Sequence, residues 1–226
     1  MNKAASVRTG LIIVVSSPSG GGKSSLCQRL LSWSANFVRS VSCTTRPPRT
    51  GEKHGQDYFF VSVEEFERRI AAGDFLEHAK YNGHYYGTPR RFVEEQLAAG
   101  QDVLLTIEVQ GAAQVMQQVR GSPLKRSGQG FAYPDALVTI FLVPPTLGLL
   151  EQRLRKRGTD SDEAVRKRLA VAAQEMAYWR EYDYAIVTGH IDEDFAYAKA
   201  ILIAEKCKTA RAPKDGNPWQ RNELSF

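Results

Sequence analysis

The sequence predicts an α/β fold in which helices flank a central parallel sheet. Four apolar runs, rich in leucine and β-branched residues, have the length of buried strands and lie at 11–16, 103–109, 137–143 and 184–187. Segments with a helical spacing of apolar residues separate these runs, and such alternation is typical of a parallel sheet with right-handed crossovers. A glycine-rich loop that directly follows the first run is the third observation behind this prediction.

The composition indicates a globular protein. The 226 residues suffice for one α/β domain with insertions, and 42% hydrophobic and 24% charged residues are near the average of soluble domains. The net charge of +5 is modest and the arginines fall in short clusters suited to phosphate, so we expect no nucleic-acid partner. Three cysteines without C-x-x-C spacing argue against a disulfide framework or a zinc site and favour the cytoplasm. No apolar run is long enough to cross a bilayer, so we expect no membrane partner.

A helix is predicted directly after the glycine-rich loop, because Leu26, Leu30 and Leu31 have the spacing of one buried face. Residues 43–57 are rich in Thr, Arg, Pro, Gly and His, and we expect them to form a polar loop outside the core. The elements predicted up to residue 61 are a flexible polar leader at 1–9, a strand at 11–16, a helix at 24–32, and strands at 37–41 and 58–61.

Capping residues mark the start of two further helices. Ser62 and Glu65 form a capping box that opens a helix ended by Gly73. Thr88 and Pro89 have the residue types of an N-cap and a first helical residue, so we expect the next helix to begin there. Between these helices, an Asn-Gly pair predicts a hairpin. The hairpin is expected at 75–86, later helices at 111–119, 147–157, 163–180 and 195–206, and a long loop without an assigned function at 120–135.

The stretch at 16–26, SSPSGGGKSSL, predicts a phosphate-binding loop between a strand and a helix. Its glycines let backbone N–H groups turn toward phosphate oxygens, Lys23 would contact the outer phosphates of a nucleoside triphosphate, and the Ser24 hydroxyl would bind Mg²⁺. Ser17 stands where the pattern G-x-x-x-x-G-K-[ST] has its first glycine, and an ordinary glycine-rich turn is the alternative. The residues expected to hold the triphosphate are Ser17, Pro18, Ser19, Gly20, Gly21, Gly22, Lys23, Ser24 and Ser25.

Two arginines three residues apart, Arg46 and Arg49, predict a second phosphate site. Planar guanidinium groups bind phosphate through paired hydrogen bonds, and the prolines between the two arginines stiffen the segment. Tyr58 and Tyr86 could add hydroxyl donors. The alternative for this segment, taken alone, is a solvated basic turn.

Five segments together resemble the guanylate kinase family. They are SSPSGGGKSSL, SVSCTTRPPRTGEKHGQDYFF, GDFLEHAKYNGHYYGTP, IEVQGA and RLRKRGTDSDEAVRKRL, which occur in the family's order within residues 10–206. The resemblance implies a three-layer P-loop NTPase fold with a small α+β insertion that binds guanosine monophosphate (GMP) and a helical lid. It implies transfer of the γ-phosphoryl group of ATP to GMP, assisted by Mg²⁺, which yields ADP and GDP. The implied regions are a leader at 1–9, a nucleotide-binding core at 10–41, 93–145 and 167–206, a GMP-binding domain at 42–92, a lid at 146–166 and a basic tail at 207–226.

The resemblance also implies which residues bind GMP. It assigns the phosphate to Arg46, Arg49, Tyr58 and Tyr86, and the guanine to Ser42, Glu77 and Thr88. A single carboxylate can accept hydrogen bonds from both N1–H and the 2-amino group of guanine, which adenine does not offer, so Glu77 would select guanine. The alternative for Glu77 is a surface carboxylate at the end of a strand. Thr106 stands where the family often has an acidic residue, which leaves Glu108 as the acidic side chain expected near Mg²⁺ or the guanine.

Basic residues of the implied lid would surround the transferred phosphoryl group. The attacking oxygen of GMP is already anionic near neutral pH, so the reaction needs alignment and positive charge rather than a general base. For Arg155 and Lys156 we favour a solvated helix end. The expected catalytic residues are Lys23, Arg46 and three arginines that match basic positions of the family, Arg153, Arg157 and Arg168.

Two rival functions share parts of this pattern. A non-catalytic module of guanylate kinase type would bind phosphorylated peptides in the GMP cleft, but it would not need Lys23, Ser24 or the lid arginines. A P-loop kinase for another nucleotide is disfavoured by Glu77 and the arginine pair. The small-molecule partners that we expect are therefore ATP and GMP. Thr188 stands where the family tends to have asparagine after the last strand, so no adenine contact is assigned there.

Overall fold

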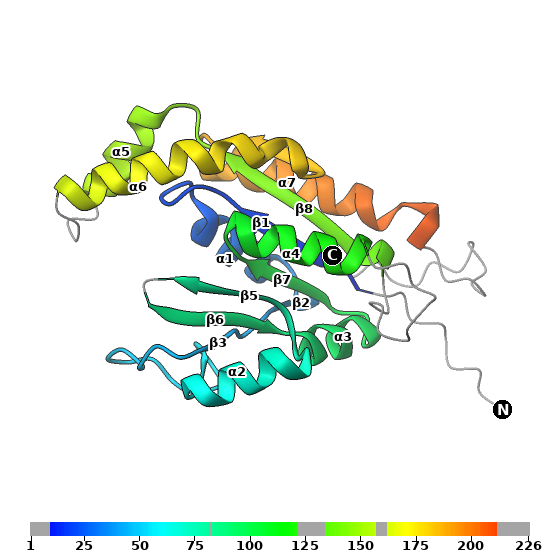
Figure 1. The fold of residues 1–226 in the computed structure, drawn as a ribbon. Coiled ribbons are helices and arrows are strands. Elements are labelled where there is room, and N and C mark those ends of the chain that lie inside the picture. Colours follow the sequence, from blue (N-terminus) through cyan, green and yellow to red (C-terminus); the bar gives the residue numbers. More distant parts are fainter. Residues whose placement is uncertain (1–9, 82, 122–133, 157–161, 212–226) are drawn as a thin grey trace.

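The structure is a computed structural model that describes residues 10–81, 83–121, 134–156 and 162–211. Its central sheet has five parallel strands in the order β2-β7-β1-β8-β9 (Figure 1). Ile12 lies opposite Val103 on one side and Leu137 on the other, so the first strand is the middle one. The predicted parallel sheet is confirmed, but the strand expected at 103–109 ends at Thr106, and Val109 is the first residue of the following helix. The strands are β1 (Ile12–Ser16), β2 (Phe37–Arg39), β7 (Asp102–Thr106), β8 (Leu137–Val143) and β9 (Tyr184–Val187).

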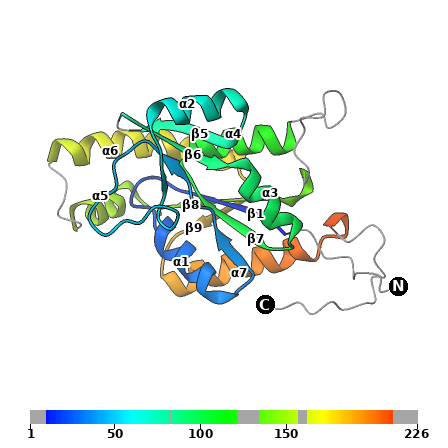
Figure 2. The ribbon, with the colours of Figure 1, turned by 90° about the horizontal axis from the view of Figure 1, so that it is seen from below.

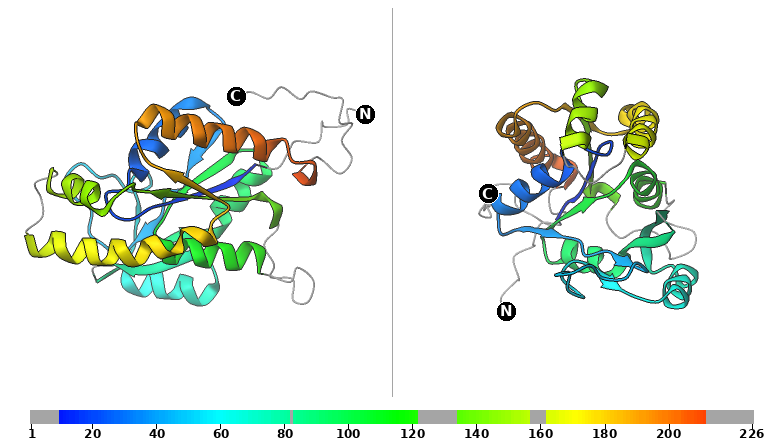
Figure 3. Two further views of the ribbon diagram at one scale, coloured as in Figure 1. Left: turned by 90° about the horizontal axis from the view of Figure 1, so that it is seen from above. Right: turned by 90° about the vertical axis from the view of Figure 1, so that its left-hand side faces the viewer.

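Helices cover both faces of this sheet and make the fold three layers thick. Ile13 and Val15 pack against α1 and α7, whereas Ile12 and Val14 pack against α3 and α4 on the opposite face. Figure 3, left, shows α7 and α4 on the two sides of the sheet. Burial on both faces explains why the central strands are unbroken apolar runs. These helices are α1 (Lys23–Trp33), α3 (Arg90–Ala98), α4 (Val109–Arg120) and α7 (Ile191–Lys206).

A smaller four-stranded sheet, of order β4-β3-β6-β5, lies beside the central one (Figure 2). Its last two strands pair antiparallel around the predicted turn, where Gly83 adopts a φ of 81°. Phe66 and Phe75 stack beneath this sheet with ring centroids 4.5 Å apart, while Leu76 joins the core of the central sheet. The small sheet therefore packs against the central sheet through the side chain of Leu76. The elements are β3 (Cys43–Thr44), β4 (Phe59–Phe60), β5 (Phe75–Tyr81), β6 (His84–Pro89) and α2 (Val63–Ala72).

The polar loop predicted at 43–57 is wrong at its first two residues. Cys43 and Thr44 are fully buried and form β3. Cys43 packs with Phe66 of α2, and the Thr44 hydroxyl donates a hydrogen bond of 2.9 Å to the carbonyl oxygen of Tyr85. Thr44 can be buried because its polar atom keeps a partner.

The predicted helix starts need two corrections. Thr88 and Pro89 belong to β6 and α3 begins after them, because the Thr88 hydroxyl donates to the Glu77 carboxylate instead of capping a helix. Ser62 does cap α2, since its hydroxyl accepts a hydrogen bond of 3.1 Å from the backbone N–H of Glu65. The Glu65 carboxylate pairs with Arg69 at 2.6 Å. Of the two hydrogen bonds of the expected capping box, the one from the Glu65 N–H to the Ser62 hydroxyl is therefore the one that forms.

The helices after β8 also differ from the prediction. The long helix expected at 163–180 is α6 (Asp162–Glu175) followed by a 3₁₀ helix, η2 (Met176–Glu181). The change of helix type precedes Tyr182, whose ring packs against Phe141 in the core. Helix α7 begins four residues earlier than predicted, because the His190 side chain accepts a hydrogen bond from the Asp192 N–H. The remaining elements are α5 (Leu147–Lys156) and the 3₁₀ helices η1 (Pro134–Ala136) and η3 (Thr209–Arg211).

Five predicted regions lie wholly or partly outside the described residues: the leader at 1–9, position 82 of the hairpin, positions 122–133 of the long loop, positions 157–161 of the lid and positions 212–226 of the tail. Within the part of the chain that the structure describes, none of the helices has the length and apolar character needed to span a bilayer.

Candidate active site

The glycine-rich loop joins the end of β1 to the start of α1 and encloses a pocket of about 180 Å³. Gly20 and Gly22 have φ values of 86° and 98°, a left-handed backbone that favours glycine. A Cβ at Gly21 would lie 2.5 Å from the Ser17 hydroxyl oxygen, so the serine side chain uses the space that Gly21 leaves. The lining comprises all nine predicted loop residues, from Ser17 to Ser25, together with Glu108.

Lys23 is fixed over this pocket by two acceptors. Its Nζ lies 2.8 Å from the Ser17 carbonyl oxygen and 3.0 Å from Oε1 of Glu108. Glu108 follows β7, the strand next to β1, and the parallel arrangement brings both strand ends to the same edge of the sheet. The Lys23 side chain is 13% exposed and that of Glu108 57%, so the carboxylate is open to solvent on one side. An anion in the loop would compete with it for the ammonium group.

Glu175, which the sequence interpretation missed, is a further carboxylate beside the loop. Burial is the main cause that raises its pKa to about 7, and the negative charge of Glu108 adds to this. Lys23 and a hydrogen bond from the Ser19 backbone act in the opposite direction. The residue ends α6, so the end of this helix and the glycine-rich loop meet at this carboxylate. No pattern within α6 distinguishes Glu175 from the other acidic residues there.

Arg46, predicted to bind phosphate, lies among aromatic rings of the small sheet. Its guanidinium carbon is 5.4 Å from the ring centroid of Tyr58, and the Tyr58 and Tyr86 rings are 6.0 Å apart. Nη2 also donates to both carboxylate oxygens of Glu52, at 2.8 and 2.9 Å. The structure thus brings Arg46, Tyr58 and Tyr86 together, and it leaves the Arg49 side chain exposed nearby. The sequence interpretation missed Glu52.

Glu77 is 5% exposed, so the alternative of a surface carboxylate is wrong. Its Oε1 accepts a hydrogen bond of 2.6 Å from the Thr88 hydroxyl, and burial raises its pKa. A Cβ at Gly111 would lie only 2.8 Å from Oε2, so the absence of a side chain at the start of α4 makes room for the carboxylate. Gln114 of the same helix ties down β5, the strand that carries Glu77, through the backbone N–H and carbonyl oxygen of His78. Ser42, the remaining residue assigned to guanine, is half-buried and precedes β3.

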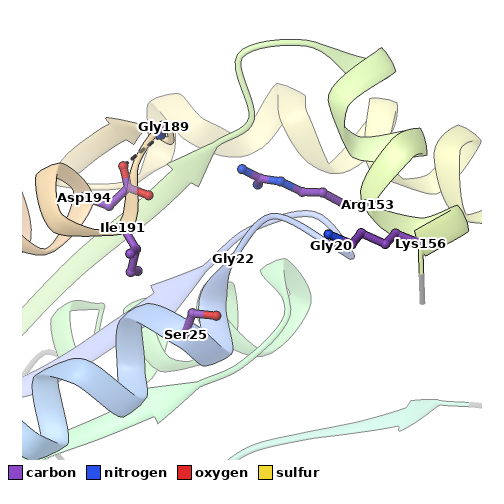
Figure 4. Close-up of a pocket in the computed structure, with 8 residues that line it drawn as sticks. All are labelled: Gly20, Gly22, Ser25, Arg153, Lys156, Gly189, Ile191 and Asp194. Atoms are coloured by element: carbon purple, nitrogen blue, oxygen red, sulfur yellow. Dashed lines mark hydrogen bonds between the residues drawn. The ribbon is translucent and has the colours of Figure 1, made fainter.

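A pocket of about 380 Å³ lies on the other side of the loop, below α5 (Figure 4). Arg153 extends into it from α5, and Asp194 and Ile191 of α7 line the facing wall. Lys156 lines it as well, although the sequence favoured a solvated helix end. Arg155 is at such an end, since it pairs with Glu151 and Asp162 on the surface.

The remaining predicted residues of this region have different positions. Arg168 is half-buried on α6, and Arg157 lies outside the described residues. Thr188 is 2% exposed and its backbone N–H donates to the carbonyl oxygen of Val143 at 2.8 Å, while Gly189 and Ile191 line the pocket in its place. Among the described residues, no group of three or more His, Cys, Asp or Glu side chains could hold a metal ion alone.

Comparisons with known proteins agree on one family. The model of the guanylate kinase family matches residues 9–205. The guanylate kinase of Symbiobacterium thermophilum is 48% identical over 202 residues, which cover 89% of each chain. That of Desulfitobacterium hafniense is 48% identical over 204 residues, which cover 90% of this chain and 94% of the relative. The crystal structure of guanylate kinase from Anaplasma phagocytophilum superposes with a TM-score of 0.68 at 37% identity over 90% of both chains.

Proposed function

The chain belongs to the guanylate kinase family, which makes it an ATP:GMP phosphotransferase, and we propose that its two phosphate-binding regions divide the two substrates between them. The loop at 17–25 holds ATP, and the small sheet holds GMP. The γ-phosphoryl group passes from ATP to the phosphate of GMP, and the products are ADP and GDP. The observation that carries this proposal is that the glycine-rich loop with Lys23 coexists with a buried carboxylate, Glu77, and with the cluster of Arg46, Tyr58 and Tyr86.

On the ATP side, the proposal rests on the backbone of the loop and on Lys23. Loop N–H groups and the N-terminus of α1 provide positive charge to the phosphates. Lys23 is already held at the pocket by the Ser17 carbonyl oxygen, so little side-chain freedom is lost when it transfers its hydrogen bonds from Glu108 to a phosphate oxygen. Arg153 supports the same side, since it extends over the loop from α5.

The residues around Lys23 suit Mg²⁺. This ion prefers oxygen ligands, keeps several waters, and is commonly bound by one or two protein groups together with substrate phosphates. The exposed Ser24 hydroxyl and the half-exposed Glu108 carboxylate line one pocket and offer such a donor set. We propose that Ser24 holds the ion and that Glu108 lies near it. When bound, Mg²⁺ neutralises charge on the phosphate oxygens.

On the GMP side, Arg46 and Arg49 bind the phosphate together with Tyr58 and Tyr86. Glu77 accepts the two adjacent donors of guanine, while Ser42 and Thr88 flank the base. Adenine would leave the buried Glu77 carboxylate without hydrogen-bond donors, and that penalty favours guanine. No proton acceptor is required, because the attacking phosphate oxygen is already anionic. Arg153, Arg157 and Arg168, with Lys23 and Arg46, stabilise the charge of the transition state.

We propose that residues 42–92 form the GMP-binding domain, that residues 146–166 form the lid, and that the remaining core binds ATP. We further propose that the enzyme acts on free nucleotides in the cytoplasm, without a nucleic-acid or membrane partner. The modest net charge of +5 supports this, because a nucleic-acid site usually needs a denser basic surface.

A coupled assay of ADP formation tests the proposal. Each of GMP, AMP, UMP and CMP is supplied with ATP and Mg²⁺, and GMP is expected to give the highest kcat/KM. Equal turnover of the four monophosphates would contradict the substrate assignment. Tight binding of a phosphopeptide without any turnover of GMP would instead favour a non-catalytic binding module.

A further inference from the structure

Glu52 holds the guanidinium group of Arg46 although the proposed reaction does not use this glutamate. Both of its carboxylate oxygens accept hydrogen bonds from Nη2 of Arg46, at 2.8 and 2.9 Å. Nη1 of the same arginine donates to the Pro47 carbonyl oxygen at 2.7 Å. A guanidinium group has five N–H donors, more than these contacts use, so Arg46 can hold Glu52 and a phosphate at the same time.

The same carboxylate also fixes the backbone that carries Arg49. Oε2 of Glu52 accepts a hydrogen bond of 2.8 Å from the Arg49 N–H, and the Glu52 N–H donates to the Arg49 carbonyl oxygen at 3.0 Å. Gly51 has a φ of 89°, which allows the chain to turn back between the two residues. One side chain therefore connects both arginines of the predicted phosphate site.

The surroundings shield this pair from water. The side chain of Arg46 is 11% exposed and that of Glu52 is 20% exposed. The rings of Tyr58 and Phe60 lie 5.4 and 5.9 Å from the guanidinium carbon of Arg46. An ion pair that is partly shielded is screened less by solvent and salt than one on an open surface.

We infer that Glu52 is a positioning residue for the acceptor phosphate, which holds the Arg46 guanidinium and the Arg49 backbone in the arrangement that receives GMP. This inference rests on the proposed function. The alternative is that Glu52 occupies the phosphate position and must leave before GMP binds. Positioning is favoured because Glu52 is bound to the backbone of its own turn, so its departure would also open that turn. The two roles predict opposite changes in GMP affinity when the carboxylate is removed.

The test compares Glu52→Ala and Glu52→Gln with Glu95→Gln, a control that removes a carboxylate from an exposed pair with Arg91 on α3. Calorimetric titration measures the Kd of GMP without ATP and the Kd of ATP without GMP, and a thermal scan gives each Tm. Misplaced binding groups commonly weaken a site by one or two orders of magnitude, so we expect Glu52→Ala to raise the Kd of GMP by roughly 10-fold or more. Glu52→Gln keeps an acceptor and is expected to have a smaller effect. The Kd of ATP and the Tm should stay near the control values.

Three outcomes would overturn the inference. An unchanged Kd of GMP would show that Glu52 does not position the arginines, and a lower Kd would show that it competes with the phosphate. Parallel losses of GMP binding, ATP binding and Tm would indicate a role in folding alone. Failure of the proposed function is distinguishable from these, because the unsubstituted protein would then neither bind nor phosphorylate GMP.

Discussion

The phosphate loop is one unbroken stretch of chain, whereas the proposed GMP site is assembled from residues of several strands and loops. The loop at 17–25 follows one strand and opens one helix, and its shape depends mainly on glycines within it. The GMP site depends on contacts between distant residues, such as Thr88 with Glu77 and Gly111 with Glu77. The proposed ATP side is therefore a local structure, whereas the proposed choice of GMP depends on tertiary packing. Substitutions on the two sides should therefore have separable effects.

The largest effect is expected for Lys23→Ala on the ATP side. Removal of a positive charge that we propose contacts the transferred group should lower kcat by about 10⁴-fold, as for other charged groups in phosphoryl transfer. The Kd of GMP should stay unchanged, because Lys23 contacts Ser17 and Glu108 and none of the small-sheet residues that we propose bind GMP. Single-turnover kinetics and calorimetry measure the two quantities. Lys167→Ala, which removes an exposed lysine from α6, is the control, and an equal loss of GMP affinity would contradict the division.

The next effect concerns the proposed lid, where two arginines of α5, one at the pocket and one on the surface, can be compared. Arg153 lines the pocket above the loop, whereas Arg155 pairs with Glu151 and Asp162 on the surface. We expect Arg153→Ala to lower kcat by about 10³-fold, as expected for an arginine that stabilises transition-state charge. Arg155→Ala should change kcat little. Steady-state kinetics with both substrates measures kcat. Similar losses of kcat in the two variants would show that only the overall positive charge of α5 matters, and that Arg153 makes no specific contact.

The third prediction is on the GMP side. Glu77→Gln keeps an oxygen that can accept from the Thr88 hydroxyl but replaces one acceptor with an amide that cannot receive the 2-amino group of guanine. The ratio of kcat/KM for GMP to that for AMP should fall by about 10²-fold. The KM for ATP should remain as it is. Glu67→Gln, an exposed carboxylate of the same region, serves as the control, and an unchanged substrate ratio would refute the role of Glu77.

The same contrast explains what could be predicted from the sequence. The strands β8 and β9 and the phosphate loop were predicted at their observed positions because continuous apolar runs and consecutive glycines are local signals. The residue type of Thr88 predicts a helix cap and the family resemblance places it with Glu77 at the guanine, but only the fold shows that its hydroxyl donates to the Glu77 carboxylate. Glu52 could not be found either, since its role depends on the turn at Gly51 that directs the carboxylate back to Arg46.

The smallest effect is expected for Glu175, beside the phosphate loop, and it concerns the stability of the protein. Its pKa is raised from 4.5 to about 7, mainly by burial, so the folded protein binds a proton more readily than the unfolded chain. The stability that this group contributes is fully present below pH 4.5 and is lost as the pH rises through 7. Glutamine does not titrate, so Glu175→Gln removes this loss. The free energy of unfolding of the variant, minus that of the unsubstituted protein, should therefore rise between pH 4.5 and 7 and stay constant above pH 7.

Urea denaturation at several pH values measures this difference, with Glu163→Gln as the control. Glu163 is an exposed residue of the same helix and pairs with Lys167 at 2.8 Å. The difference in free energy of unfolding should be modest, because Glu175 is only partly buried and solvent weakens the effect of its surroundings on the carboxylate. A saturating concentration of ATP would add negative charge near Glu175 and should shift the transition to higher pH. If the difference between variant and unsubstituted protein does not change with pH, Glu175 does not titrate beside the loop.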